Sequence, residues 1–126
     1  MTAPSRRSAR RTALFLLYQW DLTGQPLTSL YEGDVDDFAR VLAEAVSGRA
    51  DDLDGLISGA AEGWPADRLG VVERNVLRIA TLELLDRRVP QEVAIAEAVA
   101  LTKRYASDEA GRLVNGILGR IAREAA

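Results

Sequence analysis

The sequence predicts an all-α fold for the whole chain. Every long segment carries apolar residues at the spacing of a helix, and no alternating run of β-branched residues between turn signals indicates a strand. The chain has 126 residues, of which 48% are hydrophobic. That length suits one compact domain that buries about two thirds of the surface its unfolded chain exposes. We therefore expect a single domain over residues 1–126.

The first predicted helix runs from about Ser5 to Leu22. It ends before Gly24 and Pro26, which are common stop signals, and a short turn at residues 27–32 is expected to follow.

Two further helices are expected in the first half, and aspartates precede both. One helix follows Asp36 and closes at Gly48, and the other follows Asp51 and ends near Gly63. Carboxylates at a helix start can accept hydrogen bonds from free N–H groups, but they can also bind a hard cation. We favour capping and expect no metal site. A glycine repeat in the second of these helices predicts close packing against another helix: Gly55, Gly59 and Gly63.

Three helices are expected in the second half. Residues 70–87 carry two apolar stripes, so this helix should be covered on two sides and lie at the centre. Pro90 breaks it and suits the first turn of the next helix, which reaches Tyr105. Ser107 is expected to cap the last helix, and packing is expected at Gly116 and Gly119. Five residues form the expected inner face of that helix: Ala110, Leu113, Val114, Ile117 and Ile121.

The composition narrows the possible chemistry. With no cysteine and no histidine, the chain lacks thiolate chemistry, the commonest general base and the commonest metal ligand. Enzyme chemistry would have to rest on carboxylates, Lys103 or a hydroxyl. We expect no cofactor. No segment approaches the roughly 20 apolar residues of a membrane span, and a signal peptide is not expected because its apolar core would be too short. These features lead us to expect a cytoplasmic protein.

The net charge of −3 conceals an uneven distribution. Residues 1–20 carry four arginines and no acid, residues 21–67 carry two basic and eleven acidic side chains, and residues 68–126 carry ten and eight. An acidic chain of this kind can still bind a polyanion through its basic regions.

Four arginines stand where a helix start prefers negative charge. At about 100° per residue, Arg6, Arg10, Arg7 and Arg11 fall within one sector of about 140°, which continues into Leu14, Leu17 and Tyr18. Burying four guanidinium groups without acidic partners is costly. We therefore expect the three apolar residues to anchor the helix while the arginines lie outside the core. They would then either contact nucleic-acid phosphate or form a solvated helix end.

Tyr105 has two possible roles. It ends a predicted helix beside Lys103 and Arg104, with Arg112 nearby, so its ring could stack on an RNA base. It could equally be a core tyrosine with an exposed hydroxyl.

Several segments resemble the NusB family of bacterial transcription antitermination factors. They are RRSARRTALFLLYQWDL near the N-terminus, then VERNVLRIATLELL, VPQEVAIAEAVALTKRYAS and LVNGIL. The resemblance implies a compact fold of about seven helices in two packed bundles, at about residues 1–64 and 65–126.

The resemblance also implies a function without catalysis. Family members bind single-stranded boxA RNA of ribosomal RNA leader transcripts together with NusE, a small-subunit ribosomal protein. The complex joins other Nus factors on RNA polymerase and supports processive transcription of ribosomal RNA genes.

The resemblance assigns two sets of residues. Tyr18 and Glu73 match positions that face NusE. The expected RNA-binding set combines matched positions with the basic sector: Arg6, Arg7, Arg10, Arg11, Tyr105, Glu109 and Arg112. Arg11 stands where other members carry an acid, and Leu113 stands where others carry an aromatic residue.

Two alternatives remain at this point. The chain could be the RNA-binding front of a ribosomal RNA methyltransferase, although it contains no strand and glycine loop for a methyl donor. It could also be a helical scaffold that uses its acidic middle and does not bind RNA.

Overall fold

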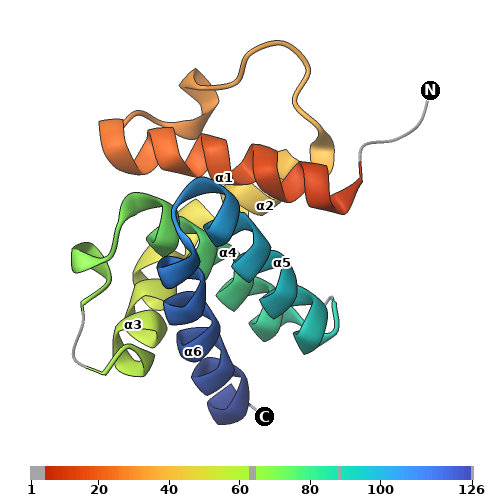
Figure 1. Cartoon of the computed structure of the whole chain (residues 1–126). Coiled ribbons are helices and arrows are strands. Elements are labelled where there is room, and N and C mark those ends of the chain that lie inside the picture. The colour runs from red at the N-terminus through yellow and green to blue at the C-terminus, as the bar shows by residue number, and fades with distance from the viewer. Residues whose placement is uncertain (1–4, 63–64, 88, 126) are drawn as a thin grey trace.

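The computed structural model describes residues 5–62, 65–87 and 89–125, and these residues form α-helices and 3₁₀ turns without a strand (Figure 1). The all-α prediction is confirmed, with six α-helices and two 3₁₀ turns in place of about seven helices. None of the described helices is long and apolar enough to cross a membrane. The elements are α1 (Arg6–Thr23), η1 (Leu27–Ser29), α2 (Asp37–Gly48), α3 (Ala50–Ala60), η2 (Ala66–Arg68), α4 (Val71–Asp86), α5 (Gln91–Tyr105) and α6 (Asp108–Ala125).

Short polar side chains cap three of the helices. The hydroxyl of Ser5 accepts a hydrogen bond from the Ser8 N–H at 3.1 Å, and the Asp36 carboxylate accepts one from the Ala39 N–H at 3.1 Å. The Ser107 hydroxyl does the same at the start of α6. The caps predicted at Asp36 and Ser107 are therefore confirmed. The expected cap before α3 is wrong, because this helix begins at Ala50 with Arg49 at the N-cap position and no side-chain cap, so Asp51 lies within its first turn.

Helix α4 is the centre of the fold, as predicted. Its residues from Asn75 to Leu84 are all buried, and it contacts each of the other five α-helices. One continuous cluster of buried apolar residues includes side chains from all six helices. The division into two bundles stays a prediction, because α4 joins helices from both halves of the chain.

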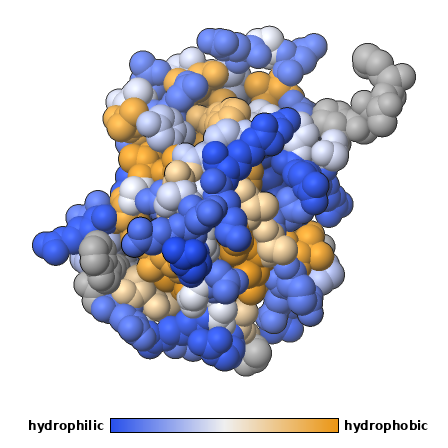
Figure 2. All heavy atoms as spheres, in the orientation of Figure 1, coloured by the Kyte–Doolittle hydropathy of each residue, from blue (hydrophilic) through white to orange (hydrophobic). Residues whose placement is uncertain are grey.

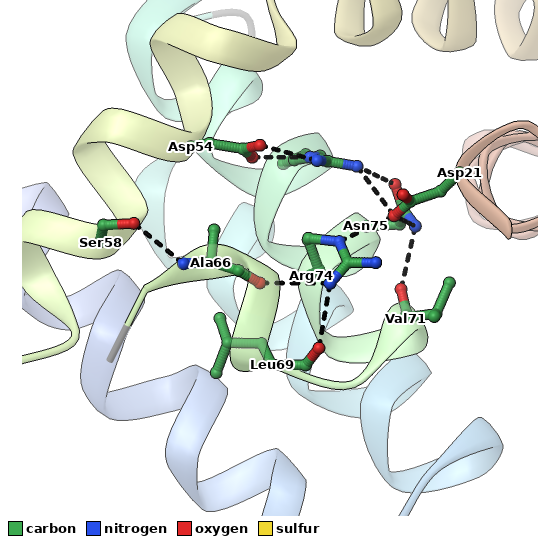
Figure 3. Close-up of polar contacts among 9 residues, drawn as sticks. Asp21, Asp54, Ser58, Ala66, Leu69, Val71, Arg74 and Asn75 are labelled. Carbon is green, nitrogen blue, oxygen red and sulfur yellow. Dashed lines mark hydrogen bonds and ion pairs between the residues drawn. The ribbon is translucent and has the colours of Figure 1, made fainter. Parts of the chain in front are cut away.

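Polar contacts attach α1 to α4 at both ends. Near the start of α1, Arg10 pairs with Glu83 near the end of α4. Near the end of α1, Asp21 accepts hydrogen bonds from Arg74, Asn75 and Arg78 in the first half of α4 (Figure 3). The two helices therefore lie antiparallel, and side chains far apart in the sequence fix their register.

The Arg10–Glu83 pair corrects one expectation from the sequence. Arg10 is only 4% exposed, and its guanidinium donates hydrogen bonds of 2.8 to 3.2 Å to both carboxylate oxygens of Glu83. These bonds raise the pKa of Arg10 further above its ordinary value despite burial, so the group stays charged. The expectation that all four arginines lie outside the core is wrong for Arg10, because α4 supplies the acidic partner.

Exposure and glycine packing also differ from expectation. Leu113 is 47% exposed and Leu118 is buried on the inner face of α6 instead. Within the described part of the chain, a Cβ atom added at Gly55, Gly59 or Gly116 would meet nothing within 4 Å, so packing against these residues does not explain the glycines. A close approach occurs at Gly111, where an added Cβ would lie 2.7 Å from Cγ of Lys103. At Gly119 it would make only ordinary contact with Arg123, and Gly63 lies outside the described residues.

Glu83→Gln should strongly destabilise the fold, because it leaves the Arg10 charge buried without a counter-charge. We expect a loss of about 3–5 kcal/mol in the free energy of unfolding, measured by urea denaturation at neutral pH. The double variant Arg10→Met/Glu83→Leu should recover most of this loss, because neither charge remains. A double variant no more stable than Glu83→Gln would contradict the role assigned to the pair.

Candidate nucleic-acid interface

The four arginines at the start of α1 diverge in three directions. Arg10 enters the core. Arg6 lies over the ring of Phe38 in α2, with its guanidinium carbon 5.1 Å from the ring centroid. Arg7 and Arg11 lie on the side of α5. The four arginines span about 140° of the circumference of α1, which is wide enough to face α2, α4 and α5 in turn. The start of α1 therefore contributes side chains to both the core and the surface.

A small pocket lies between α1 and α5. It is lined by Arg7 and Arg11 of α1 and by Glu97, Ala100, Leu101 and Arg104 of α5. Arg7 donates hydrogen bonds to Glu97 at 2.9 to 3.2 Å, which raise the pKa of Arg7. The Arg7 side chain nevertheless stays 78% exposed. Solvent screens such a pair, so these guanidinium groups remain available to a phosphate.

An aromatic pair continues the pocket along α1. The rings of Phe15 and Tyr105 meet edge to face, with centroids 5.2 Å apart. Phe15 is 45% exposed, whereas Tyr105 is partly buried against the core. The Arg104 guanidinium lies over the Tyr105 ring at 5.3 Å. Tyr105 thus packs partly inward and lies beside an aromatic and a cationic side chain, and stacking on an RNA base stays a prediction.

Glu109 and Arg112 are exposed in the first turns of α6. The stem of Lys103 passes over Gly111, so the end of α5 lies against the start of α6. In Figure 1 the α5–α6 connection also lies against α1. The fold therefore brings three of the predicted RNA-binding residues to one region, Arg7, Arg11 and Tyr105, while Glu109 and Arg112 follow on α6. We call its centre the basic-aromatic face: Arg7, Arg11, Phe15, Lys103, Arg104 and Tyr105.

Sequence reasoning missed two contributors to this arrangement. Phe15 lies one helical turn after Arg11, so its place on the same stripe of α1 could have been recognised. Glu83 lies within a helix predicted to be covered on two sides, and a buried acid needs a cationic partner. The presence of an acid in a helix predicted to be buried therefore indicated a basic partner, but the sequence did not identify which arginine it is.

The two residues matched to the NusE-facing side lie on α1 and α4. Leu14 and Leu17 anchor α1 as predicted, at 1% and 0% exposure. Tyr18 does not anchor it, because it is 38% exposed and adjoins exposed Phe15 and Leu22 on the same stripe. Glu73, in the first turn of α4, is half-buried with its carboxylate folded over Gly70. Tyr18 and Glu73 lie toward the same end of the α1–α4 pair.

This arrangement fits a nucleic acid better than a small substrate. Planar guanidinium groups donate paired hydrogen bonds to phosphate oxygens, and exposed aromatic edges and faces suit bases. The pocket beside Arg7 and Arg11 is shallow and open, and the chain contains no histidine or cysteine.

Comparison with known proteins gives consistent matches over nearly the whole chain. The model of the NusB family matches residues 7–123. The transcription antitermination protein NusB of Rubrobacter xylanophilus is 41% identical over 121 residues, which cover 90% of this chain and 87% of that protein. Its counterpart in Salinispora tropica is 42% identical over 130 residues, which cover 94% and 96%.

Solved structures agree with the sequence matches. NusB of T. maritima superposes with a TM-score of 0.87 at 36% identity, covering 98% of this chain and 94% of that one. A structure of the antitermination factors NusB and NusE in complex with dsRNA gives a TM-score of 0.83 at 32% identity, covering 94% and 96%. From the family match, these relatives and the shared fold, we conclude that this chain belongs to the NusB family.

Proposed function

We propose that this chain is a transcription antitermination factor that binds boxA RNA of ribosomal RNA leader transcripts together with NusE. The observation that carries the proposal is the likeness, over nine tenths of the chain, to proteins named for antitermination. A structural neighbour that holds NusE and RNA supports both partners.

The geometry favours different roles for the arginines. Arg7 and Arg11 are accessible beside Arg104 and are suited to RNA phosphates, with Arg6 as a further contact on the side of α2. Arg10 holds α1 against α4 and so positions its neighbours. Tyr105, Glu109 and Arg112 supply the adjoining surface that distinguishes one base from another, because phosphate contacts alone carry no sequence information.

The same proposal covers catalysis, localisation and the wider complex. The chain acts by binding in the cytoplasm, without enzymatic turnover, and reaches RNA polymerase through NusE and other Nus factors. A methyltransferase fragment is the weaker alternative, because the relatives are named for antitermination and match this chain over most of their own length. A scaffold without RNA binding would leave the basic-aromatic face unused.

Replacing Arg6, Arg7 and Arg11 by glutamine should weaken RNA binding and its dependence on salt. If each contacts one phosphate, the slope of log affinity against log salt should flatten by about 2, since each single-strand contact contributes about −0.7. Titration of a labelled boxA RNA between 50 and 200 mM salt measures this, with helicity checked by circular dichroism.

Arg40→Gln is the matched control, because Arg40 is a partly exposed, ion-paired arginine on α2. It should leave the slope unchanged. A triple variant with the native affinity and slope would show that these arginines form only a solvated helix end.

Tyr105→Leu should reduce discrimination between boxA and scrambled RNA, because leucine keeps apolar bulk but removes the ring. Stacking of one base contributes about 1–3 kcal/mol, so affinity for boxA should fall about fivefold or more. Tyr105→Phe should retain both the affinity for boxA and the discrimination, because the ring remains. The proposal for Tyr105 fails if the leucine variant distinguishes the two RNAs as well as the native chain does.

Glu73→Lys should weaken binding to NusE more than direct binding to RNA, because Glu73 lies apart from the basic-aromatic face. Calorimetry with NusE and a parallel RNA titration measure the two effects. Glu92→Lys is the control. Glu92 lies in the first turn of α5, as Glu73 does in α4, so a lysine at either position opposes the helix dipole in the same way. Equal losses with both partners, or none with either, would remove Glu73 from the NusE-facing surface.

A further inference from the structure

A groove lies between the end of α3 and the exposed side of α6, and of its lining residues only Arg112 has a role in the function proposed above. Ala60, Ala61 and Glu62 line it on one side. The other side is α6, where Leu113 and Ile117 lie among Arg112, Gly116, Arg120 and Arg123. Figure 2 shows hydrophilic side chains on the face where α6 runs, with apolar patches between them.

The α6 wall of the groove is a straight basic stripe. At about 100° per residue, Arg112, Gly116, Arg120 and Arg123 fall within about 80° of the helix circumference. At about 1.5 Å per residue, the stripe extends about 16 Å from Arg112 to Arg123. It is therefore long enough to follow a strand across several phosphates.

The charges along this stripe are available to a ligand. Among the described residues, Arg112 and Arg123 form no ion pair. Arg120 lies 3.7 Å from Glu62 and 3.0 Å from Glu124. Both glutamates are well exposed, at 85% and 61% of their side chains. Water and salt screen such pairs, so a phosphate can replace these carboxylates at Arg120.

Gly116 lies in the middle of the stripe without a structural reason. It weakens the helix, and among the residues that the structure describes an added Cβ would meet nothing within 4 Å. A glycine at such a place lets a ligand approach the helix backbone closely. The stripe thus offers positive charge at both ends and room in the middle.

We propose that this groove is a second RNA contact, which binds the phosphate backbone of nucleotides flanking boxA. The inference rests on the proposed function. Continuity favours RNA as the occupant, because Arg112 belongs both to the predicted boxA surface and to the groove. The arginines match phosphate in charge and in paired hydrogen-bond geometry. Backbone contact makes the groove indifferent to the sequence of the flanking nucleotides.

The test compares boxA RNA alone with boxA extended by uridines at its 5′ end or its 3′ end. The native chain should bind one extended RNA more tightly than boxA alone, with a salt slope steeper by about 1.4 if Arg120 and Arg123 contact one phosphate each. Arg120→Gln/Arg123→Gln should abolish the gain from the extension and leave binding of boxA alone unchanged. Arg40→Gln should keep the gain.

Gly116→Leu supplies a second variant, because it fills the groove without removing charge. It too should abolish the gain while circular dichroism shows native helicity. The inference is overturned if extension brings no gain to the native chain, or if the gain survives in both groove variants. Selective loss of NusE binding in the arginine variant would instead identify an acidic protein segment as the occupant. Failure of the native chain to bind any boxA RNA would refute the proposed function itself.

Discussion

The fold depends on Arg78, an arginine at the centre of the molecule that two aspartates hold. Its guanidinium donates hydrogen bonds of 2.7 Å to both oxygens of Asp54 in α3 and one of 3.0 Å to Asp21 in α1 (Figure 3). Burial would raise the pKa of Asp21, but the hydrogen bond from Arg74, the charge of Arg78 and the hydrogen bond from Asn75 together lower it. Asp21 therefore stays ionised. Through Arg78, its carboxylate and that of Asp54 fix the positions of α1 and α3 along α4. Because α1 is fixed at this end, its arginine-rich start can be placed against α5.

The start of α1 carries positive charge where the first turn of a helix prefers negative charge. Two different interactions account for this. Arg10 finds its counter-charge inside the protein, on Glu83. Arg7 and Arg11 stay at the surface, where the counter-charge we propose belongs to RNA. The buried Arg10–Glu83 ion pair holds this part of α1 against α4. It therefore also positions Arg7 and Arg11, which flank Arg10 in the sequence. A binding surface of this kind loses little freedom when its ligand arrives.

Periodicity and cap residues were sufficient to predict the helices, because these signals are local. They located α4 at the centre and Ser107 at the start of α6. They could not identify the Arg10–Glu83 pair, whose members are separated by 73 positions and meet only through tertiary packing. Apolar type alone also did not distinguish exposed Leu113 from buried Leu118, since both fit a helical stripe and tertiary packing decides which is covered. The basic-aromatic face was predicted in part: helical spacing grouped Arg7 and Arg11, and the same spacing could have added Phe15, whereas its contact with Tyr105 depends on where α5 ends.

The open glycines of α3 have a consequence for engineering. Gly55 and Gly59 lie within a helix, and space for a methyl group is free at both. Glycine in a helix costs about 0.5–1 kcal/mol relative to alanine, chiefly through the freedom of the unfolded chain. Neither glycine lies in the basic-aromatic face or lines the α6 groove. Replacing Gly55 and Gly59 by alanine should therefore raise the thermal stability of the chain and leave both proposed RNA contacts intact.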